Sequence, residues 1–410
     1  MQRIAFFVSV LVAGGFATVG GQAPATNVTV FEHARIIVGD ARAPIEDATF
    51  VVSGSRFAQV GKGSEIQAPA GATRINLTGK TVMPALVDTH NHLSQTPDAI
   101  VNDLTRRAYF GVGAAMSLGQ DTADAPFEAR ARTMPGLARI FTAGRGVTAP
   151  EPGRTTAPFW VTTTAEARKA VQDNAAKKVD IIKIWVDDRD GTVTKLTPEL
   201  YGAAIDEAHK QGLRAIAHVF TLEDAKGLVR AGIDAFAHGV RDKDVDDEFM
   251  ALVKQHPNLV LGPNLPDRGV VADLEWLRAS LAPADFAALQ KGNTNRPEAQ
   301  ATFGIQARNL ARMNAAGVRI VVGTDGNTPY APHVEMADMV AAGMTPAQVI
   351  VAATSNGAAF LKMTDTGTIE SNKSADFIVF DANPLDDITN TRKISSVYLR
   401  GTQVNRSAYK

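Results

Sequence analysis

A regular alternation of apolar, strand-like runs with helical stretches constrains the fold of this chain more than any other feature. Eight such runs can be counted between residues 81 and 364. In chain order they are Val82–His92, Gly113–Gly119, Ala138–Gly144, Asp180–Val186, Arg214–Phe220, Asp234–Val240, Asn258–Asn264 and Arg319–Asp325. Buried strands separated by helices are typical of parallel βα units, and eight units predict an α/β fold, a closed (β/α)8 TIM-like barrel.

The segments between these runs fit helices. Thr164–Lys178 keeps apolar or small residues on one face, and Thr197-Pro198-Glu199 combines an N-cap, a proline in the first turn and an acid. An open doubly wound sheet is the alternative, but no Gly-rich phosphate loop follows the first run. Ala272–Arg296 is longer than a simple connection and predicts a helical insertion near the mouth of the barrel.

Both ends of the chain have a different texture, with short β-rich runs separated by Gly, Pro and Asp. These runs are Val28–Val38, Ala48–Val60, Thr73–Leu77, Ala375–Asp381 and Ile394–Val404. They predict that residues 26–80 and 365–410 pair into one small β-sandwich domain beside the barrel, which then spans residues 81–364.

Residues 1–25 have the layout of a secretory signal peptide. Met1–Arg3 carries one positive side chain, Ile4–Ala17 is apolar, and Ala23-Pro24-Ala25 supplies small residues. The apolar stretch is shorter than the ~20 residues that cross a bilayer, so a retained anchor is the weaker alternative. We therefore expect a secreted or periplasmic protein that begins near Thr26 and has no stable membrane span. The absence of Cys fits an oxidising compartment.

Composition and charge limit the classes of molecule that this chain is expected to bind. The 410 residues are 45% hydrophobic and 21% charged, which is typical of a globular protein. The formal net charge is −1 and no Lys/Arg block is present, so nucleic acid is excluded as a partner. A small molecule is the expected partner, and a homo-oligomer is left open.

Two histidines stand at the end of the first predicted barrel strand. In Val87-Asp88-Thr89-His90-Asn91-His92, alternation places His90 and His92 on the same face, about 7 Å apart. A lone His-x-His is a weak metal signal. Its position strengthens it, because barrel enzymes place their chemistry at the carboxyl ends of the strands.

Four further side chains stand at the same ends of other strands: Lys183, His218, His238 and Asp325. Each has a structural alternative when taken singly, as a lysine whose head reaches water, as a core histidine, or as a helix-capping carboxylate. These alternatives would all have to hold together. The set of six therefore predicts a metal site, and Lys183 is its most diagnostic member because an unpaired ammonium is costly to bury.

This set resembles the ligands of the amidohydrolase superfamily, and the resemblance covers nearly the whole mature chain. The tail resembles the imidazolonepropionase-like and Xaa-Pro dipeptidase-like branch. The tail motifs are Thr366-Gly367-Thr368-Ile369-Glu370, Ser374-Ala375-Asp376-Phe377 and Asn383-Pro384-Leu385. Two departures lie outside the ligand set: Pro84-Ala85 replaces a usual Pro-Gly, and Ser371-Asn372-Lys373 replaces a usual Pro-Gly-Lys.

The resemblance implies two divalent ions bridged by Lys183 after its ε-amine reacts with CO₂ to form a carbamate. By the same analogy His90, His92 and Asp325 hold the more buried ion, and His218 and His238 hold the other. Imidazole and carboxylate ligands suit Zn²⁺ best, with Mn²⁺, Co²⁺ or Fe²⁺ as alternatives. Two ions about 3.5–4 Å apart can share a water and lower its pKa towards ~7, giving a bridging hydroxide.

The expected reaction is hydrolysis of an amide with a carboxylate nearby, such as a dipeptide or an N-acyl amino acid, with Asp325 as the catalytic general base. Lactone, carbamate or phosphotriester hydrolysis would use the same metals, and a non-catalytic secreted binding protein is a different alternative. Loop residues that could contact substrate are Arg145, Arg154, Trp185, Arg241, Tyr330 and His333.

Overall fold

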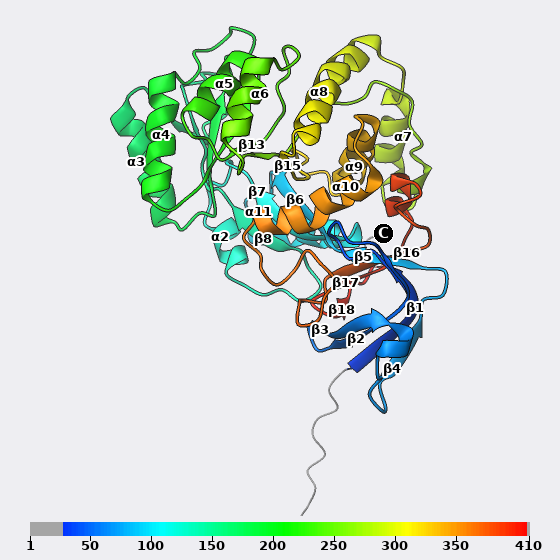
Figure 1. The fold of residues 1–410 in the computed structure, drawn as a ribbon. Helices are drawn as coiled ribbons and strands as arrows, with labels where there is room; N and C mark the ends of the chain where they lie inside the picture. Colours follow the sequence, from blue (N-terminus) through cyan, green and yellow to red (C-terminus); the bar gives the residue numbers. More distant parts are fainter. Residues whose placement is uncertain (1–27, 408–410) are drawn as a thin grey trace, which may run out of the picture.

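The structure is a computed structural model and describes residues 28–407. Helices surround one part of the molecule, and the strands from both chain ends gather in a smaller part beside it (Figure 1). The predicted signal peptide lies outside the described residues. Within residues 28–407 the helices are all too short or too polar to cross a bilayer.

Eight parallel strands form the barrel. They are β6 (Leu86–Asn91), β7 (Val112–Ser117), β8 (Arg139–Thr142), β11 (Ile182–Val186), β12 (Ala215–Val219), β13 (Ala235–Phe236), β14 (Val260–Leu261) and β15 (Arg319–Ile320). Two short strands, β9 (Val147–Thr148) and β10 (Phe159–Trp160), extend the β11–β15 sheet. At one junction Asp180 N donates to Thr142 O at 2.9 Å, and at the other Thr89 N donates to Val322 O at 2.9 Å. These bonds join both sheet edges, and the predicted barrel fold is confirmed.

Helices cover the barrel between its strands (Figure 1). They are α1 (Pro97–Tyr109), α2 (Ala125–Arg130), α3 (Thr164–Ala176), α4 (Pro198–Lys210), α5 (Leu222–Arg230), α6 (Asp247–Gln255), α7 (Pro283–Gly292), α8 (Pro297–Ala315), α9 (Ala331–Ala341), α10 (Pro346–Val351) and α11 (Gly357–Phe360). Thr163 and Glu166 form a capping box that starts α3, and the Thr197 side chain caps α4 as expected. The insertion predicted over Ala272–Arg296 contains a 3₁₀ turn, Glu275–Leu277, and α7.

The strands from the two chain ends form one eight-stranded sheet. Its members are β1 (Val28–Ile36), β2 (Ile45–Ser53), β3 (Arg56–Lys62), β4 (Thr73–Asn76), β5 (Thr81–Pro84), β16 (Phe377–Phe380), β17 (Ile394–Leu399) and β18 (Thr402–Gln403). A bridge between Arg56 and Ser374 brings β3 back to the start of β16. The curled sheet encloses an aromatic cluster in which Phe31 stacks on Phe50 at 4.6 Å and meets Phe377 edge-on at 5.3 Å.

One predicted strand is wrong in its extent. Val82–His92 is two strands, because β5 pairs with β1 and β16 in the terminal sheet while β6 belongs to the barrel. Pro84 lacks an N–H donor, and the next N–H, of Ala85, donates to Asp376 O at 3.0 Å. The chain therefore passes from the terminal sheet into the barrel at this point.

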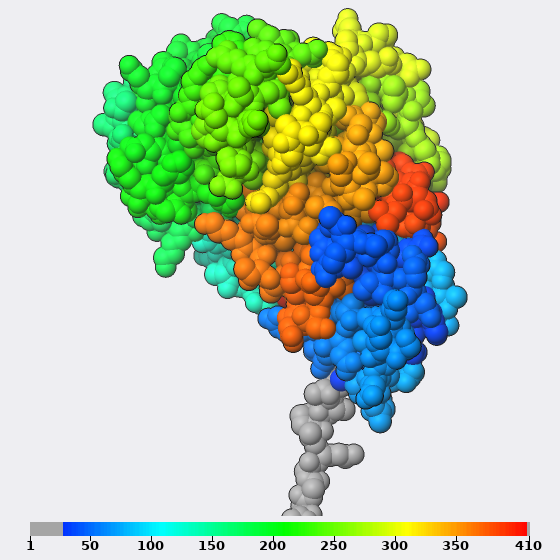
Figure 2. Space-filling model, viewed as in Figure 1, coloured from blue at the N-terminus to red at the C-terminus, as the bar shows by residue number. Residues whose placement is uncertain are grey.

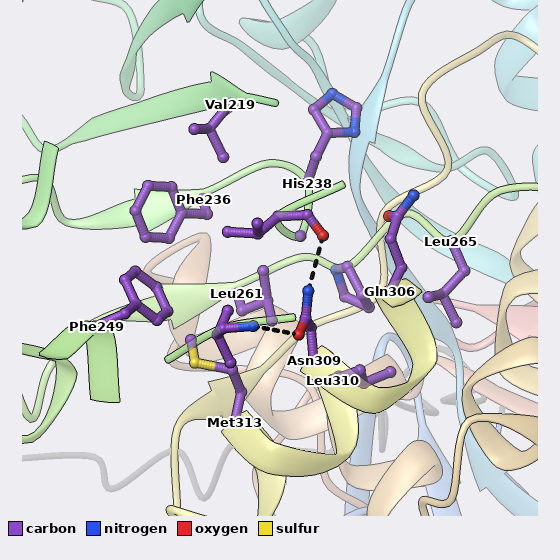
Figure 3. Close-up of a pocket in the computed structure, with 14 residues that line it drawn as sticks. Val219, Phe236, His238, Phe249, Leu261, Leu265, Gln306, Asn309, Leu310 and Met313 are labelled. Atoms are coloured by element: carbon purple, nitrogen blue, oxygen red, sulfur yellow. Dashed lines mark hydrogen bonds between the residues drawn. The ribbon is translucent and has the colours of Figure 1, made fainter. Parts of the chain in front are cut away.

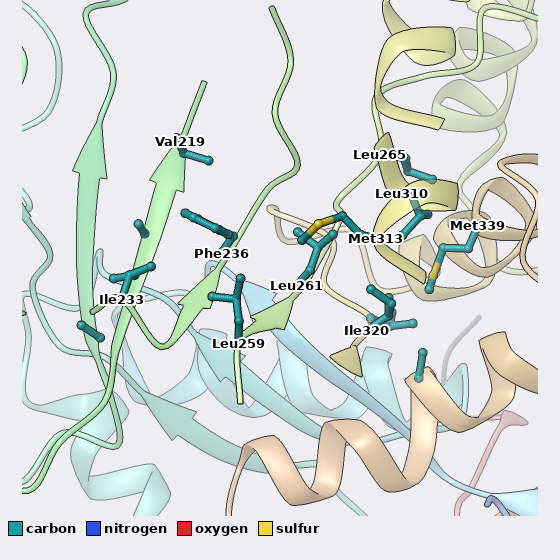
Figure 4. Close-up of a cluster of buried hydrophobic side chains, with 14 of the residues drawn as sticks. Val219, Ile233, Phe236, Leu259, Leu261, Leu265, Leu310, Met313, Ile320 and Met339 are labelled. Atoms are coloured by element: carbon teal, nitrogen blue, oxygen red, sulfur yellow. The ribbon is translucent and has the colours of Figure 1, made fainter. Parts of the chain in front are cut away.

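The largest apolar core lies between the strands and the helices outside them. In Figure 4 Leu261 of β14 lies beside Met313 of α8, while Phe236 of β13 points towards Val219 of β12; all four side chains are buried. A second layer, including Ile216 and Val260, fills the barrel interior. Burial of each large side chain in these layers contributes about 1.5–3 kcal/mol to the free energy of unfolding. The packed core therefore holds the ends of the strands in place.

Candidate metal centre

Strand alternation carries two predicted ligands into the barrel interior. Around β11, Ile181 packs inside the barrel and Ile182 packs outside it, so Lys183 returns to the inside. In β12, Ile216 packs inside and His218 follows two residues later. Both ligands therefore reach the carboxyl end of the barrel interior, where such folds carry their chemistry.

Asp325 is the centre of a compact cluster with three histidines. Its Oδ1 atom lies 3.2 Å from His90 Nε2 and 2.9 Å from His92 Nε2. Its Oδ2 atom lies 3.6 Å from His238 Nε2. Ligand atoms of His90, His238 and Asp325 lie within 4.8 Å of one another, so these three could hold one ion. Asp325 has a φ of 48°, a left-handed conformation that costs energy and is typical of functional positions.

His218 and Lys183 lie beside this cluster. The His218 ring centroid is 4.4 Å from that of His238. Lys183 is fully buried, and its Nζ atom has no hydrogen-bond partner among residues 28–407. Burial lowers the pKa of Lys183 to about 7. A charged ammonium is therefore disfavoured at this position.

The buried histidines are neutral at neutral pH. Burial lowers the pKa of His90 to about 3 and that of His218 to about 4, and it holds the pKa of His238 well below its usual value. Burial opposes ionisation of Asp325, but the charge that His90 gains at low pH and the hydrogen bonds from His90 and His92 outweigh burial and lower the pKa of Asp325 below the usual range. Neutral imidazoles and an ionised carboxylate are the forms that bind a metal ion, so this donor set fits divalent cations.

The structure thus brings all six predicted ligands to one end of the barrel. Lys183 lies close enough to His90, His218 and Asp325 for charges on these groups to shift one another's pKa values. The division of the ligands between two ions stays a prediction.

Asn264 is a site residue that sequence reasoning missed. With its amide oriented to satisfy all partners, its oxygen accepts from His238 Nδ1 at 3.1 Å and its nitrogen donates to Thr324 O at 3.1 Å. This leaves His238 Nε2 free of its proton and directed at Asp325. Asn264 ends the seventh predicted strand, so its position was a signal that it belongs to the same rim.

Three charged residues around the cluster were also missed. Asp187 Oδ2 lies 2.8 Å from His218 Nε2, and Arg189 Nη1 lies 2.5 Å from the same oxygen. Asp88 accepts from Thr324 Oγ1 at 2.9 Å and from His90 N at 3.2 Å, and burial raises its pKa to about 6. The motif Asp88-Thr89-His90 had placed Asp88 on the same strand face as His90, which was the available signal.

A small apolar cavity of about 20 Å³ lies behind His238 (Figure 3). Beside it Asn309 of α8 accepts from Val245 N at 2.8 Å and donates to Val240 O at 3.1 Å. These two bonds hold the loop that follows β13, and with it His238, against the barrel.

The six predicted substrate residues occupy different surroundings. Arg145 donates to the carbonyls of Ala157 at 2.6 Å and Pro158 at 3.1 Å, and so braces its own loop. Arg154 is about half exposed and pairs with Glu151 at 2.9 Å. A Cβ on Gly146 would meet the Trp185 ring at 2.0 Å, so that glycine leaves room for the indole.

The other three lie on later loops and on α9. Arg241 has a buried Nε without a partner among the described residues and lies in the field of Asp325. His333 is fully buried in α9 with Nε2 2.8 Å from Phe110 O. Tyr330 meets Trp276 edge-on at 5.8 Å. Direct substrate contact by any of the six stays a prediction.

A barrel with a histidine and aspartate cluster at its carboxyl end defines a class of metal-dependent hydrolases. Residues 81–404 match the amidohydrolase family, and the chain belongs to it. An uncharacterized protein of Mycobacterium tuberculosis is 29% identical over 77% of this chain and 82% of its own length. The imidazolonepropionase of Streptomyces avermitilis is 26% identical over 82% and 81%.

A solved structure of a candidate prolidase from Bifidobacterium longum superposes with a TM-score of 0.75 at 29% identity. It covers 93% of this chain and 95% of its own. Together with the family assignment, these relatives show that the chain is a hydrolase acting on C–N bonds.

Proposed function

We propose that this amidohydrolase cleaves an amide bond near a carboxylate, as in a dipeptide or an N-acyl amino acid. The observation that carries the metal chemistry is Lys183, buried without a partner beside the Asp325 cluster. The names of the relatives support a C–N bond as the target. Lactone, carbamate and phosphotriester bonds are the competing targets, because the same donor set would serve them.

In this proposal His90, His92 and Asp325 would hold one divalent ion, preferably Zn²⁺, and His218 and His238 would hold the second. Lys183, as its CO₂-derived carbamate, would be a ligand of both. When bound, the ions would activate a water as the nucleophile and polarise the scissile carbonyl. Asp325 accepts the proton of the nucleophile and passes it to the departing amine. Asn264 accepts the hydrogen bond from Nδ1 of His238 and so keeps the proton on that nitrogen. The lone pair of His238 Nε2 is then available to bind a metal ion.

We further propose that residues 1–25 are removed as a signal peptide, so that the enzyme acts as a secreted or periplasmic protein. Expression of the full-length chain, cell fractionation and N-terminal sequencing test this directly. A mature chain starting near Thr26 outside the cytoplasm is expected. Full-length protein confined to the cytoplasm would contradict it.

The test of function combines metal analysis with a substrate panel. We expect two divalent ions per chain, a carbamate signal from ¹³C-labelled bicarbonate, and turnover confined to dipeptides or N-acyl amino acids. Lys183→Ala removes the carbamate signal and most of the metal, whereas Lys210→Ala, at an exposed lysine on α4, changes neither. A fully loaded enzyme that cleaves only lactones or phosphotriesters would overturn the amide proposal.

A further inference from the structure

A large cavity lies between the insertion after β14 and helix α9. It has a volume of about 1050 Å³, at the upper end of the ~300–1,000 Å³ of typical small-molecule sites. Its walls include Trp276, Leu289 of α7 and Val334 of α9. Figure 1 shows α7 and α9 on the same side of the barrel, and the 3₁₀ turn Ile388–Arg392 contacts α9.

This cavity borders the metal ligands. Asn264 and Thr324 both line it. The Asn264 side chain contacts His238, and Thr324 directly precedes Asp325. A substrate whose scissile bond lies at Asp325 therefore has its neighbouring group within reach of the cavity.

Part of the cavity wall is apolar. Leu265, Trp276 and Leu289 supply apolar surface. Four of its charged lining residues form two ion pairs: Arg268 Nε lies 2.9 Å from Asp338 Oδ1, and Arg296 Nη2 lies 2.5 Å from Asp267 Oδ2. The Arg392 guanidinium stacks 4.9 Å from the centre of the Trp276 ring.

We propose that this cavity is the specificity pocket of the enzyme and takes a large apolar group, alkyl or aromatic, attached next to the scissile bond. The inference rests on the proposed function and names its substrate class: amides with a bulky apolar substituent. A charged group that pairs with Arg268 or Asp338 would take one of these residues from the other, and a charge in the cavity wall would lose its partner. An apolar group that packs against Leu265, Trp276 and Leu289 displaces water from apolar surface.

Ligand binding tests the pocket without turnover. Calorimetry on the metal-loaded protein would follow two series of product-like ligands, the alkanoates from butyrate to octanoate and the amino acids from glycine to phenylalanine. Each series resembles one of the two products of amide cleavage, and only one product has its substituent in the cavity. In the series that resembles this product, affinity should rise about fourfold for each methylene that becomes buried. Octanedioate should bind at least tenfold more weakly than octanoate. Equal affinities throughout both series, or tighter binding of octanedioate, would overturn the pocket.

Variants locate the effect. Trp276→Ala removes one apolar wall and Ala288→Phe fills the cavity, so each should weaken the largest ligands at least tenfold and leave the smallest unchanged. Trp160→Ala, at an exposed tryptophan outside the cavity, is the matched control and should change neither. A size preference that both cavity variants retain would place the pocket elsewhere. If the ligands bind as expected but no amide is cleaved, the proposed function fails and the pocket stands.

Discussion

Asp325 has two tasks that one carboxylate can combine, holding a metal ion and moving a proton. We expect Asp325→Asn to keep the fold, because its hydrogen bonds to His90 and His92 are replaceable by an amide. Turnover should fall about 10²–10⁴-fold, the usual effect of losing a general base. Steady-state kinetics with metal content measured on the same sample checks this. Near wild-type kcat at full metal occupancy would remove Asp325 from the proton pathway.

Asn264 offers a separate test of how the ligands are oriented. Asn264→Leu removes the acceptor for His238 Nδ1, and metal affinity should fall about 10–100-fold, as is usual when such a partner is lost. Asn264→Asp keeps an acceptor and should retain most of the affinity. Competition with a chelator measures both variants. Equal metal affinity of the Leu variant and the wild type would show that Asn264 does not position His238.

The predicted ligands could be found from local sequence patterns, whereas the contacts of the missed residues depend on how a loop folds. Strand alternation and strand ends predict His90, Lys183 and His218, because these follow from local geometry. Asp187 and Arg189 meet His218 only after the loop beyond β11 turns back, and Arg189 adopts a φ of 55° there. No periodic pattern encodes that turn, so their contacts could not be predicted.

At the scale of elements, the apolar runs predicted where strands lie better than how far they pair. The runs at Asp234–Val240 and Asn258–Asn264 are each seven residues long, whereas β13 and β14 pair over two residues each. Burial sets the length of an apolar run, while pairing depends on how the barrel staggers its strands. Val82–His92 was also too long, because this one apolar run contains the last strand before the barrel and the first strand of the barrel, with Pro84 at their junction.

Helix α9 carries two buried carboxylates, Glu335 and Asp338, one turn apart on its inner face. Burial raises the pKa of Asp338 to about 7, although Arg268 opposes the shift. In the unfolded chain this group titrates near about 3.9, so the folded state binds an extra proton between these values. The contribution of Asp338 to stability is therefore fully present below about pH 4 and is lost as pH rises towards about 7.

Asp338→Asn should remove this pH dependence. Relative to the variant, the wild type should lose up to about 1.4 kcal/mol of unfolding free energy per pH unit between about pH 4 and 7. Urea denaturation of both proteins at several pH values measures the difference. Parallel curves for the two proteins would show that Asp338 is ionised throughout this range.

At the scale of the whole molecule, the terminal sheet and the barrel are tied together by pairings of very long sequence separation. The composition of the chain ends predicted that their strands pair, but no local sequence pattern predicts which strand pairs with which. Arg139 of β8 reaches Asp365 at 2.9 Å and Asp376 at 3.1 Å, more than 220 residues away. In Figure 2 the segment that carries these acids fills the seam between the helices and the N-terminal strands.

A single substitution at this seam should lower the free energy of unfolding. Asp376 is 4% exposed, so Arg139→Leu would leave its charge buried and unpaired, and unfolding free energy should fall by about 3 kcal/mol. Adding Asp376→Asn should recover part of the loss because it removes that charge. Arg132→Leu, at an exposed pair with Glu128 3.8 Å away, should leave the denaturation midpoint nearly unchanged. If the Arg139 and Arg132 variants unfold alike, the ion pairs of the seam do not hold the terminal sheet to the barrel, and the apolar contacts around β5 and β16 must do so alone.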